Sequence, residues 1–419
     1  MKEERLMNLT KKRWLILALC CLVNLCIGAV YAWSVFASPM AEHLTELLGR
    51  ELTSGDLALA YTVCNGVGPI TMISGGIIND KLGPKKVILI AGIMYGAGMF
   101  LAGFSTSVGM LIVTYGLIAG LGLGMAYGCT ISTAVKYFPD KSGMAGGIAT
   151  AVYGLSSVIL PPIVTKLVSG MGITSTFKVL GIVFLVIIVV CSFFLQKCPD
   201  GFVPDGWTPP AKTESAAPTV ENKNWKQMLS SPIFYVMIIM MMCGAVSGMM
   251  VISQASSVAS NMIGMTVEAA AIAVSVLALF NAFGRIIAGT LSDKIGRINT
   301  LFLGLVLAIC GLLILFFCKE GAMVQFYLGV ILVGVSFGTF MGVYPGFTAD
   351  RFGAKNNSVN YGFMFIGFAL SGLVGPMLMK MVYGSAGVYQ PAFIFAAGFA
   401  VEGIVLSFVY RGMAKKKEK

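Results

Sequence analysis

The eight-residue sequence Gly76-Ile-Ile-Asn-Asp80-Lys81-Leu-Gly83 has a counterpart of the same pattern in the second half of the chain, Gly289-Thr-Leu-Ser-Asp293-Lys294-Ile-Gly296. In both copies Asp follows the first Gly by four residues, Lys comes next, and a second Gly closes the loop. One copy would be an ordinary turn, but two copies between matching apolar stretches indicate a duplicated unit. Gly permits a tight turn or close helix contact, and Asp can cap the next helix or pair with nearby basic residues. We expect both to be conformational loops.

The composition around these loops is that of a membrane protein. Hydrophobic residues make up 57% of the 419 residues and charged residues only 11%, whereas soluble domains carry about 25% charged residues. The apolar runs are 20 or more residues long, as a membrane-spanning helix requires and a transmembrane strand does not. We therefore expect an all-α polytopic membrane protein, and the net charge of +11 indicates basic cytoplasmic loops rather than a nucleic-acid partner.

Twelve apolar stretches predict twelve transmembrane helices. All but six of the 29 Lys and Arg residues fall in the termini and in every second loop, and positive residues mark the cytoplasmic side. We therefore expect a multi-pass protein of the cell membrane with both termini in the cytoplasm. The predicted helices are 14–36, 56–78, 87–106, 109–134, 143–168, 176–196, 232–256, 267–290, 299–318, 323–346, 358–382 and 389–410.

A polar, proline-rich stretch divides these helices into two sets of six. Residues 197–230 are too polar to enter a bilayer and too rich in Pro to form one helix. The sequence thus predicts an N-terminal six-helix bundle over 1–196, a cytoplasmic linker over 197–230 and a C-terminal six-helix bundle over 231–419, the two bundles being pseudo-symmetric.

The loops and the twelve-span plan together resemble the major facilitator superfamily, over the whole chain. A narrower resemblance, to the monocarboxylate transporters and above all to their bacterial oxalate/formate antiporter branch, rests on three segments: Gly28-Ala-Val-Tyr31-Ala-Trp33-Ser34, Tyr137-Phe138-Pro139-Asp140-Lys141-Ser-Gly-Met-Ala145-Gly-Gly147, and Asn281-Ala-Phe-Gly284-Arg285. The resemblance implies alternating access between two bundles and small organic anions, such as lactate, pyruvate, formate or oxalate, as substrates.

Arg285 is the strongest candidate for binding such an anion. It lies in a predicted helix made otherwise of apolar residues, where an unpaired cation costs at least about 2.5–3.5 kcal/mol and Arg cannot escape by deprotonation. Its planar fork matches a carboxylate; a structural ion pair or snorkelling to the interface is the alternative. Asn281, one turn earlier on the same face, is expected to orient Arg285 or to bind substrate. Animal members carry Asp there, implicated in proton coupling, and the neutral amide departs from that pattern.

The eleventh predicted helix suggests how many charges the substrate carries. In the oxalate/formate type a Lys in this helix supplies a second cation, and the register of Asn360-Tyr361-Gly362 places Phe368 at that position. One cation compensates a monoanion better than a dianion, which favours a monocarboxylate over oxalate. Aromatic residues are expected to line the same site, although core packing explains each one alone about as well: Tyr31, Trp33, Tyr127, Tyr153, Phe337, Tyr344 and Tyr361.

The sequence therefore predicts a secondary transporter of monocarboxylates, coupled to protons or working by exchange, and no enzyme. No P-loop, nucleotide site or metal spacing occurs, so we expect no cofactor or metal; the expected partners are a small organic anion and the lipid bilayer, with protons as a further candidate. An oxalate/formate-type dicarboxylate exchanger and a carboxylate sensor that does not transport remain as alternatives. A cationic-drug exporter would need a buried acid in helices 1 to 6, and none lies at mid-depth. Glu402 is a charge inside the last helix whose role stays open.

Overall fold

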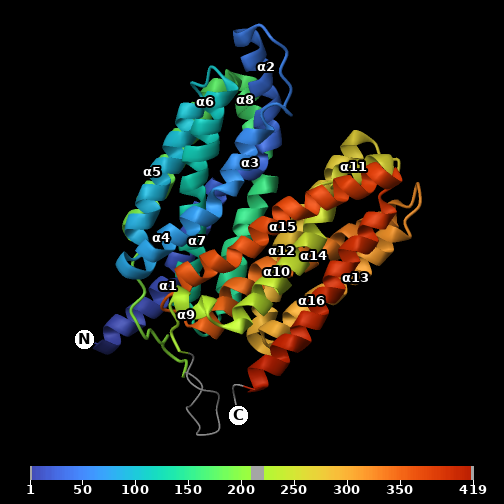
Figure 1. Cartoon of the computed structure of the whole chain (residues 1–419). Coiled ribbons are helices and arrows are strands. Elements are labelled where there is room, and N and C mark those ends of the chain that lie inside the picture. Colours follow the sequence, from blue (N-terminus) through green and yellow to red (C-terminus); the bar gives the residue numbers. More distant parts are fainter. Residues whose placement is uncertain (1, 209–220, 417–419) are drawn as a thin grey trace. The chain divides into compact units, whose positions relative to one another are not determined.

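The computed structural model describes residues 2–208 and 221–416, and the described chain is helical (Figure 1). Residues 209–220 of the predicted linker and the last basic residues, Lys417 and Lys419, lie outside the described part. The first elements are α1 (Lys2–Ile27), the 3-10 helix η1 (Gly28–Ala32), α2 (Trp33–Leu48), α3 (Ala58–Gly66), α4 (Gly68–Leu82), α5 (Pro84–Ala102), α6 (Val108–Leu111), the π-helix η2 (Ile112–Ala119), α7 (Gly120–Tyr137) and α8 (Ser142–Phe194). The others are α9 (Trp225–Leu229), α10 (Pro232–Ile252), α11 (Ala255–Asn261), α12 (Val267–Ile295), α13 (Arg297–Phe316), α14 (Met323–Phe352), α15 (Asn357–Ala386) and α16 (Gln390–Lys416).

Within residues 2–208 and 221–416, ten helical stretches are long and apolar enough to cross a membrane. Two local breaks explain why this number is lower than the twelve predicted spans. The 53-residue α8 contains spans five and six, because Gly172 at φ 78° interrupts its helical backbone. Span two is divided at Val67 into α3 and α4, each too short to count alone. Pro69 explains this break, since its ring nitrogen has no hydrogen to donate to the preceding turn.

The first span is longer than the sequence predicts. It was expected to end near residue 36, but α2 continues to Leu48 and stops at Gly49, whose left-handed φ of 63° ends the helix. Helix-favouring residues such as Met40, Ala41 and Leu44 are buried in this extension, and Pro39 is tolerated within it. Burial of an apolar face therefore outweighs the polar residues that ended the predicted span.

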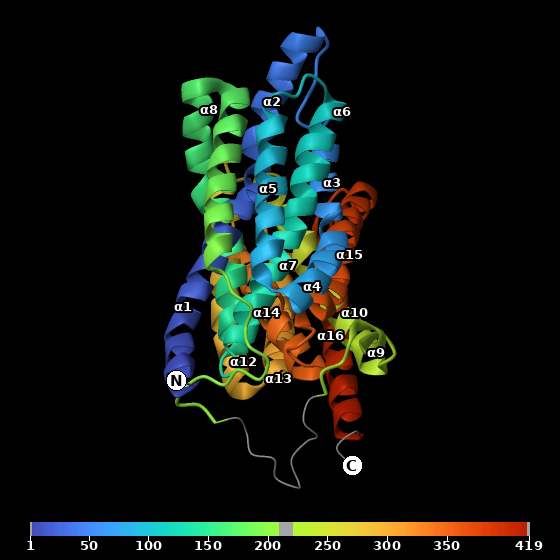
Figure 2. The same ribbon diagram turned by 90° about the vertical axis from the view of Figure 1, so that its left-hand side faces the viewer.

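The described residues form two compact units. The first contains the chain up to Pro139, Val152–Gly206 and Lys355–Gly362; the second contains Asp140–Ala151, Trp207–Ala354 and Phe363 onward. Helices α8 and α15 therefore each begin in one unit and continue in the other. In the first unit α5 and α7 pack side by side, and the tips of α2 and α6 lie at the same end (Figure 2).

Rows of glycine at four-residue spacing bring the helices of each unit close together. In the first unit Gly116, Gly120, Gly124 and Gly128 face span two; a Cβ at Gly120 would lie 2.6 Å from the Cys64 carbonyl oxygen. In the second unit Gly334, Gly338, Gly342 and Gly346 follow the same spacing on α14, and a Cβ at Gly342 would lie 2.8 Å from the Cα of Arg285. Small residues in such rows let helices pack closely in lipid, where apolar burial drives helix association little.

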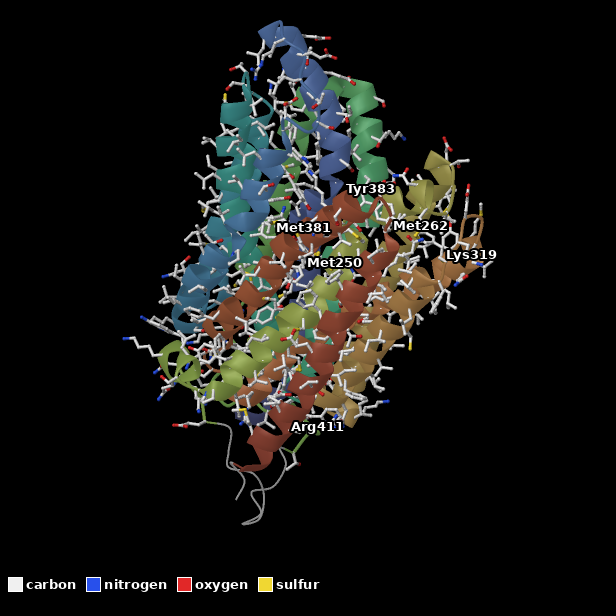
Figure 3. All side chains as sticks on the ribbon, turned by 45° about the vertical axis from the view of Figure 1, so that its right-hand side comes forward. Met250, Met262, Lys319, Met381, Tyr383 and Arg411 are labelled. Atoms are coloured by element: carbon white, nitrogen blue, oxygen red, sulfur yellow. The ribbon has the colours of Figure 1, made fainter. Side chains whose placement is uncertain are left out.

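The second unit encloses a continuous apolar core that includes Met250, Val330 and Phe393. Figure 3 shows Met250 on α10 and Met381 on α15, with Lys319 and Arg411 at opposite ends of this unit. The helices α10, α13, α14 and α16 pack on one another, so the unit holds α12 and its embedded Arg285 between well-packed neighbours.

Candidate functional site

Arg285 lies in the second unit and only 2% of its surface is exposed. Its Nε donates to the Asn281 side-chain oxygen at 3.1 Å, and one terminal nitrogen donates to the Thr150 carbonyl at 2.6 Å. In the described part of the chain no hydrogen bond involves the remaining terminal nitrogen, Nη2. The guanidinium is therefore held by two contacts, and both N–H groups of Nη2 remain for another acceptor.

Glycines explain how this arginine fits. A Cβ at Gly338 of α14 would lie 2.9 Å from the Arg285 backbone nitrogen, so α14 approaches α12 closely at this turn. The contact with Asn281 agrees with the expectation that this amide orients the guanidinium. Binding of a substrate by either residue stays a prediction.

The aromatic residues predicted for the second unit divide into a pair and a single ring. Phe337 and Phe368 are neighbours, with ring centroids 6.0 Å apart, and Phe368 is half-buried. Tyr344 is completely buried, and its hydroxyl donates to the Met237 carbonyl at 2.8 Å. That hydroxyl stabilises the packing of α14 against α10 in this structure, and it is engaged there rather than presented to a ligand.

Five aromatic residues predicted for the site lie on helices of the first unit. Tyr153 contacts Tyr31 with ring centroids 5.0 Å apart and Tyr127 at 4.6 Å. Trp33 instead stacks on two rings that sequence reasoning missed, Tyr115 at 4.7 Å and Tyr61 at 6.1 Å between centroids. Tyr361 is buried in the segment 355–362 of the same unit, where Gly362 packs against Ile73.

A break in the first span positions these rings. The chain leaves α1 as a 3-10 turn over Gly28–Ala32 and restarts at Trp33. A Cβ at Gly28 would lie 2.6 Å from Cβ of Ser156 and 2.8 Å from the Tyr153 carbonyl oxygen, so only glycine allows this approach. The close contact brings Tyr31 against Tyr153, and the 3-10 turn directs Trp33 toward Tyr115.

The first of the repeated loops joins the start of α15. Asp80 accepts hydrogen bonds from the backbone N–H groups of Ser358 and Val359, at 3.3 and 3.1 Å, and forms an ion pair with Lys136 at 2.5 Å. Gly76 makes this possible, because a Cβ there would lie 2.8 Å from the carbonyl carbon of Ser358. Gly83 takes the left-handed φ of 85°, and Lys81 is exposed.

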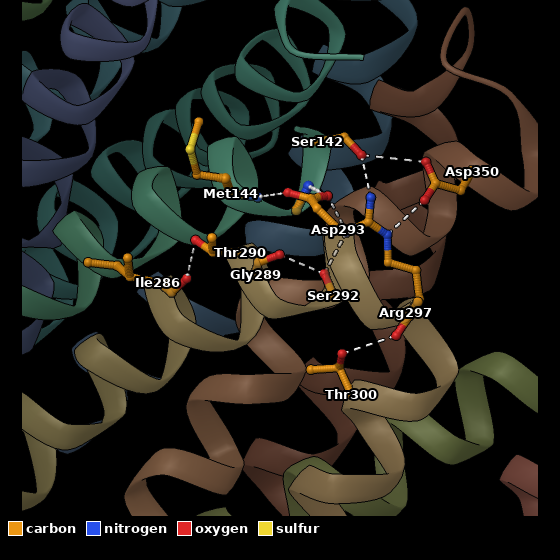
Figure 4. Close-up of polar contacts among 12 residues, drawn as sticks. Ser142, Met144, Ile286, Gly289, Thr290, Ser292, Asp293, Arg297, Thr300 and Asp350 are labelled. Atoms are coloured by element: carbon orange, nitrogen blue, oxygen red, sulfur yellow. Dashed lines mark hydrogen bonds and ion pairs between the residues drawn. The ribbon is translucent and has the colours of Figure 1, made fainter. Parts of the chain in front are cut away.

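The second loop joins the start of α8 in the matching way (Figure 4). Asp293 accepts from the N–H groups of Gly143 and Met144, at 2.9 and 2.8 Å, and pairs with Arg297 at 2.7 Å. Arg297 also binds Asp350 and the Ser142 hydroxyl, each at 2.7 Å. Gly296 has φ 89° and Lys294 is exposed. In both loops the Asp makes the contacts, whereas the Lys that follows it points to solvent.

The partners of the two loops were not predicted. The spacing of the repeat indicates a turn and an acid, but Lys136, Asp350 and the helix starts lie far away in the sequence. In the sequence these partners are indicated only by their positions: Lys136 lies near the end of span four, and Asp350 lies at the matching place in span ten.

Comparison with known proteins agrees with this architecture. The model of the Major Facilitator Superfamily matches residues 18–376 and 264–419. The chain is 29% identical over 367 residues to an uncharacterized transporter of this type, YhjX of Escherichia coli, covering 87% of each chain. It is 27% identical to the oxalate:formate antiporter of Oxalobacter formigenes, covering 93% of this chain and 89% of that protein. It is 24% identical to human monocarboxylate transporter 12, covering 96% of this chain and 80% of that protein.

The fold is shared with solved structures. The crystal structure of FucP, described as a major facilitator transporter in the outward conformation, superposes with a TM-score of 0.71 at 15% identity, covering 94% of this chain and 98% of that one. The predictions of twelve helical spans, of a transporter rather than an enzyme, and of the family are confirmed. The chain is a multi-pass membrane protein and a secondary transporter that belongs to the Major Facilitator Superfamily.

Proposed function

We propose that this transporter carries small organic anions with a single carboxylate, by alternating access between the bundles 1–196 and 231–419. The observation that carries the proposal is Arg285, a buried cation in a membrane span with one terminal nitrogen left for an acceptor. A cation buried in a membrane span costs free energy unless an anion or another acceptor pairs with it. A carboxylate would satisfy the remaining N–H groups and neutralise the charge.

No Lys or Arg lies in the middle of the eleventh span, which supports a monoanion. Phe368 stands where the resemblance to oxalate/formate exchangers places a Lys, and it packs on Phe337. A dianion would bring a second negative charge to an aromatic surface, where desolvation is not compensated. The likeness to the oxalate:formate antiporter makes oxalate exchange the second candidate.

The two loops support alternating access with both termini in the cytoplasm. Each loop acid binds the first turn of another span, and anions are stabilised at the N-terminus of a helix. We expect these hydrogen bonds to break and re-form as the cytoplasmic side opens and closes. The repeat then has one function in both halves.

Transport by purified protein in proteoliposomes tests the proposal. We expect uptake or exchange of lactate, pyruvate or formate, and weaker competition by oxalate. Arg285→Lys should reduce transport by at least about tenfold, because an ammonium lacks the planar two-point grip. Arg50→Lys, at an exposed loop position, is the matched control. Normal uptake by a well-folded Arg285→Ala variant would refute the site.

A second variant separates the two candidate substrates. Phe368→Lys should raise the ratio of oxalate to lactate binding, because a second cation compensates a dianion. Tighter binding of oxalate than lactate by the unmodified protein would instead favour the exchanger. Saturable binding of lactate without any flux would favour a sensor.

A further inference from the structure

The edge of the first unit between α5 and the second part of α8, residues 173–194, combines positive charge with an exposed aromatic ring. The two helices pack closely (Figure 2), because a Cβ at Gly92 would lie only 2.7 Å from Cγ2 of Ile188. Beside the loop that contains Asp80, the Lys85 ammonium lies 5.2 Å from the centre of the Phe193 ring. Phe193 is 56% exposed, so the ring and the lysine over it are part of the surface.

Four lysines gather at this edge. Helix α5 begins Pro84-Lys85-Lys86, and the ammonium of Lys197, which follows α8, donates to the Lys81 carbonyl oxygen at 3.2 Å. All four lysines are exposed, and among the residues that the structure describes none of them forms an ion pair. The acid of the loop, Asp80, is already paired with Lys136. The described part of this unit therefore supplies no counter-anion for the four ammonium groups.

An apolar surface continues from these charges along both helices. Ile90 and Ile93 on α5 are exposed, as are Val186 and Val190 on α8. Exposed apolar side chains of this kind mark contact with a membrane. The edge therefore has cations at one end, an aromatic ring next to them and apolar residues beyond. A phospholipid presents its headgroup, interfacial region and acyl chains in the same order.

We propose that this edge binds an anionic phospholipid of the phosphatidylglycerol type, with its phosphate on Lys85 and Lys86 and its acyl chains along Ile90 and Val190. Lysines near a membrane surface attract anionic headgroups, and basic pockets between membrane-spanning helices bind them. A zwitterionic lipid such as phosphatidylethanolamine carries its own ammonium group, which the four lysines repel. The anionic lipid is then a bound component of the first unit, whichever substrate the transporter carries.

The matching edge of the second unit, between α13 and α16, differs in its charges. Ile298 and Asn299 stand there in place of Lys85 and Lys86. The guanidinium of Arg411 lies over two phenylalanine rings, 5.7 and 5.6 Å from their centres, and donates to the Asn299 side-chain oxygen at 2.9 Å. Its cation is therefore already hydrogen-bonded within the protein, and we assign the lipid site to the first unit.

Native mass spectrometry of the purified full-length protein in detergent tests the proposal. Phosphatidylglycerol and phosphatidylethanolamine with the same acyl chains compete for the first bound lipid, and we expect a preference of at least about tenfold for phosphatidylglycerol. Lys85→Gln/Lys86→Gln should bring that preference to within about twofold of one. Lys11→Gln/Lys12→Gln removes the same charge from exposed positions on α1; it is the matched control and should keep the preference.

Phe193 acts as a positioning residue, because its ring holds the Lys85 ammonium by a cation–π contact. Phe193→Leu keeps an apolar side chain but removes this contact. It should lower the affinity for phosphatidylglycerol about two- to threefold and leave the affinity for phosphatidylethanolamine unchanged. Phe193→Tyr keeps the aromatic face and should restore the affinity.

Several outcomes would overturn the inference. Equal binding of the two lipids by the unmodified protein would do so without any variant. An equal loss of preference in the two double variants would mean that only net charge matters, and an unchanged preference in folded Lys85→Gln/Lys86→Gln would place the lipid elsewhere. Displacement of phosphatidylglycerol by an excess of inorganic phosphate would indicate a site for free anions instead of a lipid surface.

Discussion

Asp80 in the first unit and Asp293 in the second hold matching positions in their loops, and each accepts hydrogen bonds from two successive backbone N–H groups at the start of another helix. Their cations come from different places. Lys136 lies near the end of α7, two spans after the loop that contains Asp80, whereas Arg297 follows the second loop directly. The second unit adds another acid, Asp350, on the same arginine. The backbone contacts of the loop acid are thus the same in both halves, whereas the cation that pairs with it comes from a different place in each.

This difference shows which part of the repeat has a fixed role. An acid at a helix N-terminus is stabilised by the aligned peptide dipoles whatever cation stands nearby. Lysine offers a single point charge and suits one acid, whereas the arginine fork can bind two acids and a hydroxyl together. The first cluster balances one acid with one base, and the second relies on one base for two acids.

The largest effect is therefore expected from removing the arginine. Arg297→Ala leaves Asp293 and Asp350 without their shared cation, and breaking a buried pair costs about 3–5 kcal/mol. Lys136→Ala should cost less, because it removes the cation of one acid, Asp80, whereas Arg297 binds two acids and the Ser142 hydroxyl. Thermal unfolding of the two variants in the same detergent measures the difference.

The partial exposure of Asp350 reduces what it adds to this loss of stability. Asp350 is half-exposed, with 48% of its side-chain surface accessible, so most of the loss should come from Asp293. The double variant Arg297→Ala/Asp293→Asn should then recover part of the stability. Equal losses in the two single variants would contradict the idea that the second cluster depends more on its cation.

Replacing the first glycine of each loop sharpens the same comparison. At Gly289 a Cβ would clash with the Gly143 carbonyl oxygen and lie 3.1 Å from the Cα of Gly147, whereas at Gly76 the nearest atoms are 2.8 Å away. Overpacking costs about 1–3 kcal/mol, and we expect Gly289→Ala to be the more destabilising variant. Gly412→Ala, which meets open space, is the control; a larger loss at Gly76 would contradict the expectation.

The sequence predicted the loops, the twelve spans and the place of Arg285, because these features depend on local residue types. A Gly-Asp repeat, an apolar run and a charge within it are visible without knowing what packs against them. It could not predict that Lys136 forms an ion pair with Asp80, because 56 residues separate them in the sequence. The stacking of Tyr115 on Trp33 was also hidden, because the π-helix over Ile112–Ala119 changes the direction of the rings relative to an α-helix.

Glu402 marks a further asymmetry between the units. It lies on an exposed stripe of α16 whose other members are apolar, including Val401, Val405 and Phe408. The last helix of the first half, residues 173–194, carries no acid. Because Glu402 lies among exposed apolar residues of a membrane span, we expect a reagent to reach its carboxyl group from the hydrocarbon rather than from water.

Carbodiimide labelling tests this expectation. A protonated carboxyl group adds to a membrane-soluble carbodiimide and transfers its proton to the reagent nitrogen, giving an acylurea adduct that mass spectrometry detects. Glu402→Gln should abolish the adduct and change stability by no more than about 0.5 kcal/mol. Preferential labelling by a water-soluble carbodiimide would show instead that the group faces water.

The smallest effect concerns how the second and eighth spans begin. Before α3 the carboxylate of Asp56 accepts hydrogen bonds from the backbone N–H and the hydroxyl of Thr53, both at 2.8 Å, and these bonds lower the pKa of Asp56 below its ordinary value. Before α12 the hydroxyl of Thr266 accepts from the Ala269 N–H at 3.3 Å. Glu268 in the first turn of α12 is also a titratable group, but the acceptor of the Ala269 N–H is the Thr266 hydroxyl, which does not titrate, whereas Asp56 accepts from Thr53 directly.

A lowered pKa fixes the direction of the pH effect. The stabilisation from Asp56 is fully present above the ordinary aspartate pKa of about 3.9 and is lost as the pH falls through the lower pKa of the folded state. We expect hydrogen exchange at Thr53 to accelerate over that range, relative to its rate at higher pH after correction for intrinsic exchange, while exchange at Ala269 does not. Asp56→Asn should remove the pH dependence at Thr53. Because Asp56 is exposed to water, the change should stay local. This account would be contradicted if global unfolding also shifted over the same pH range and if Asp56→Asn abolished that shift.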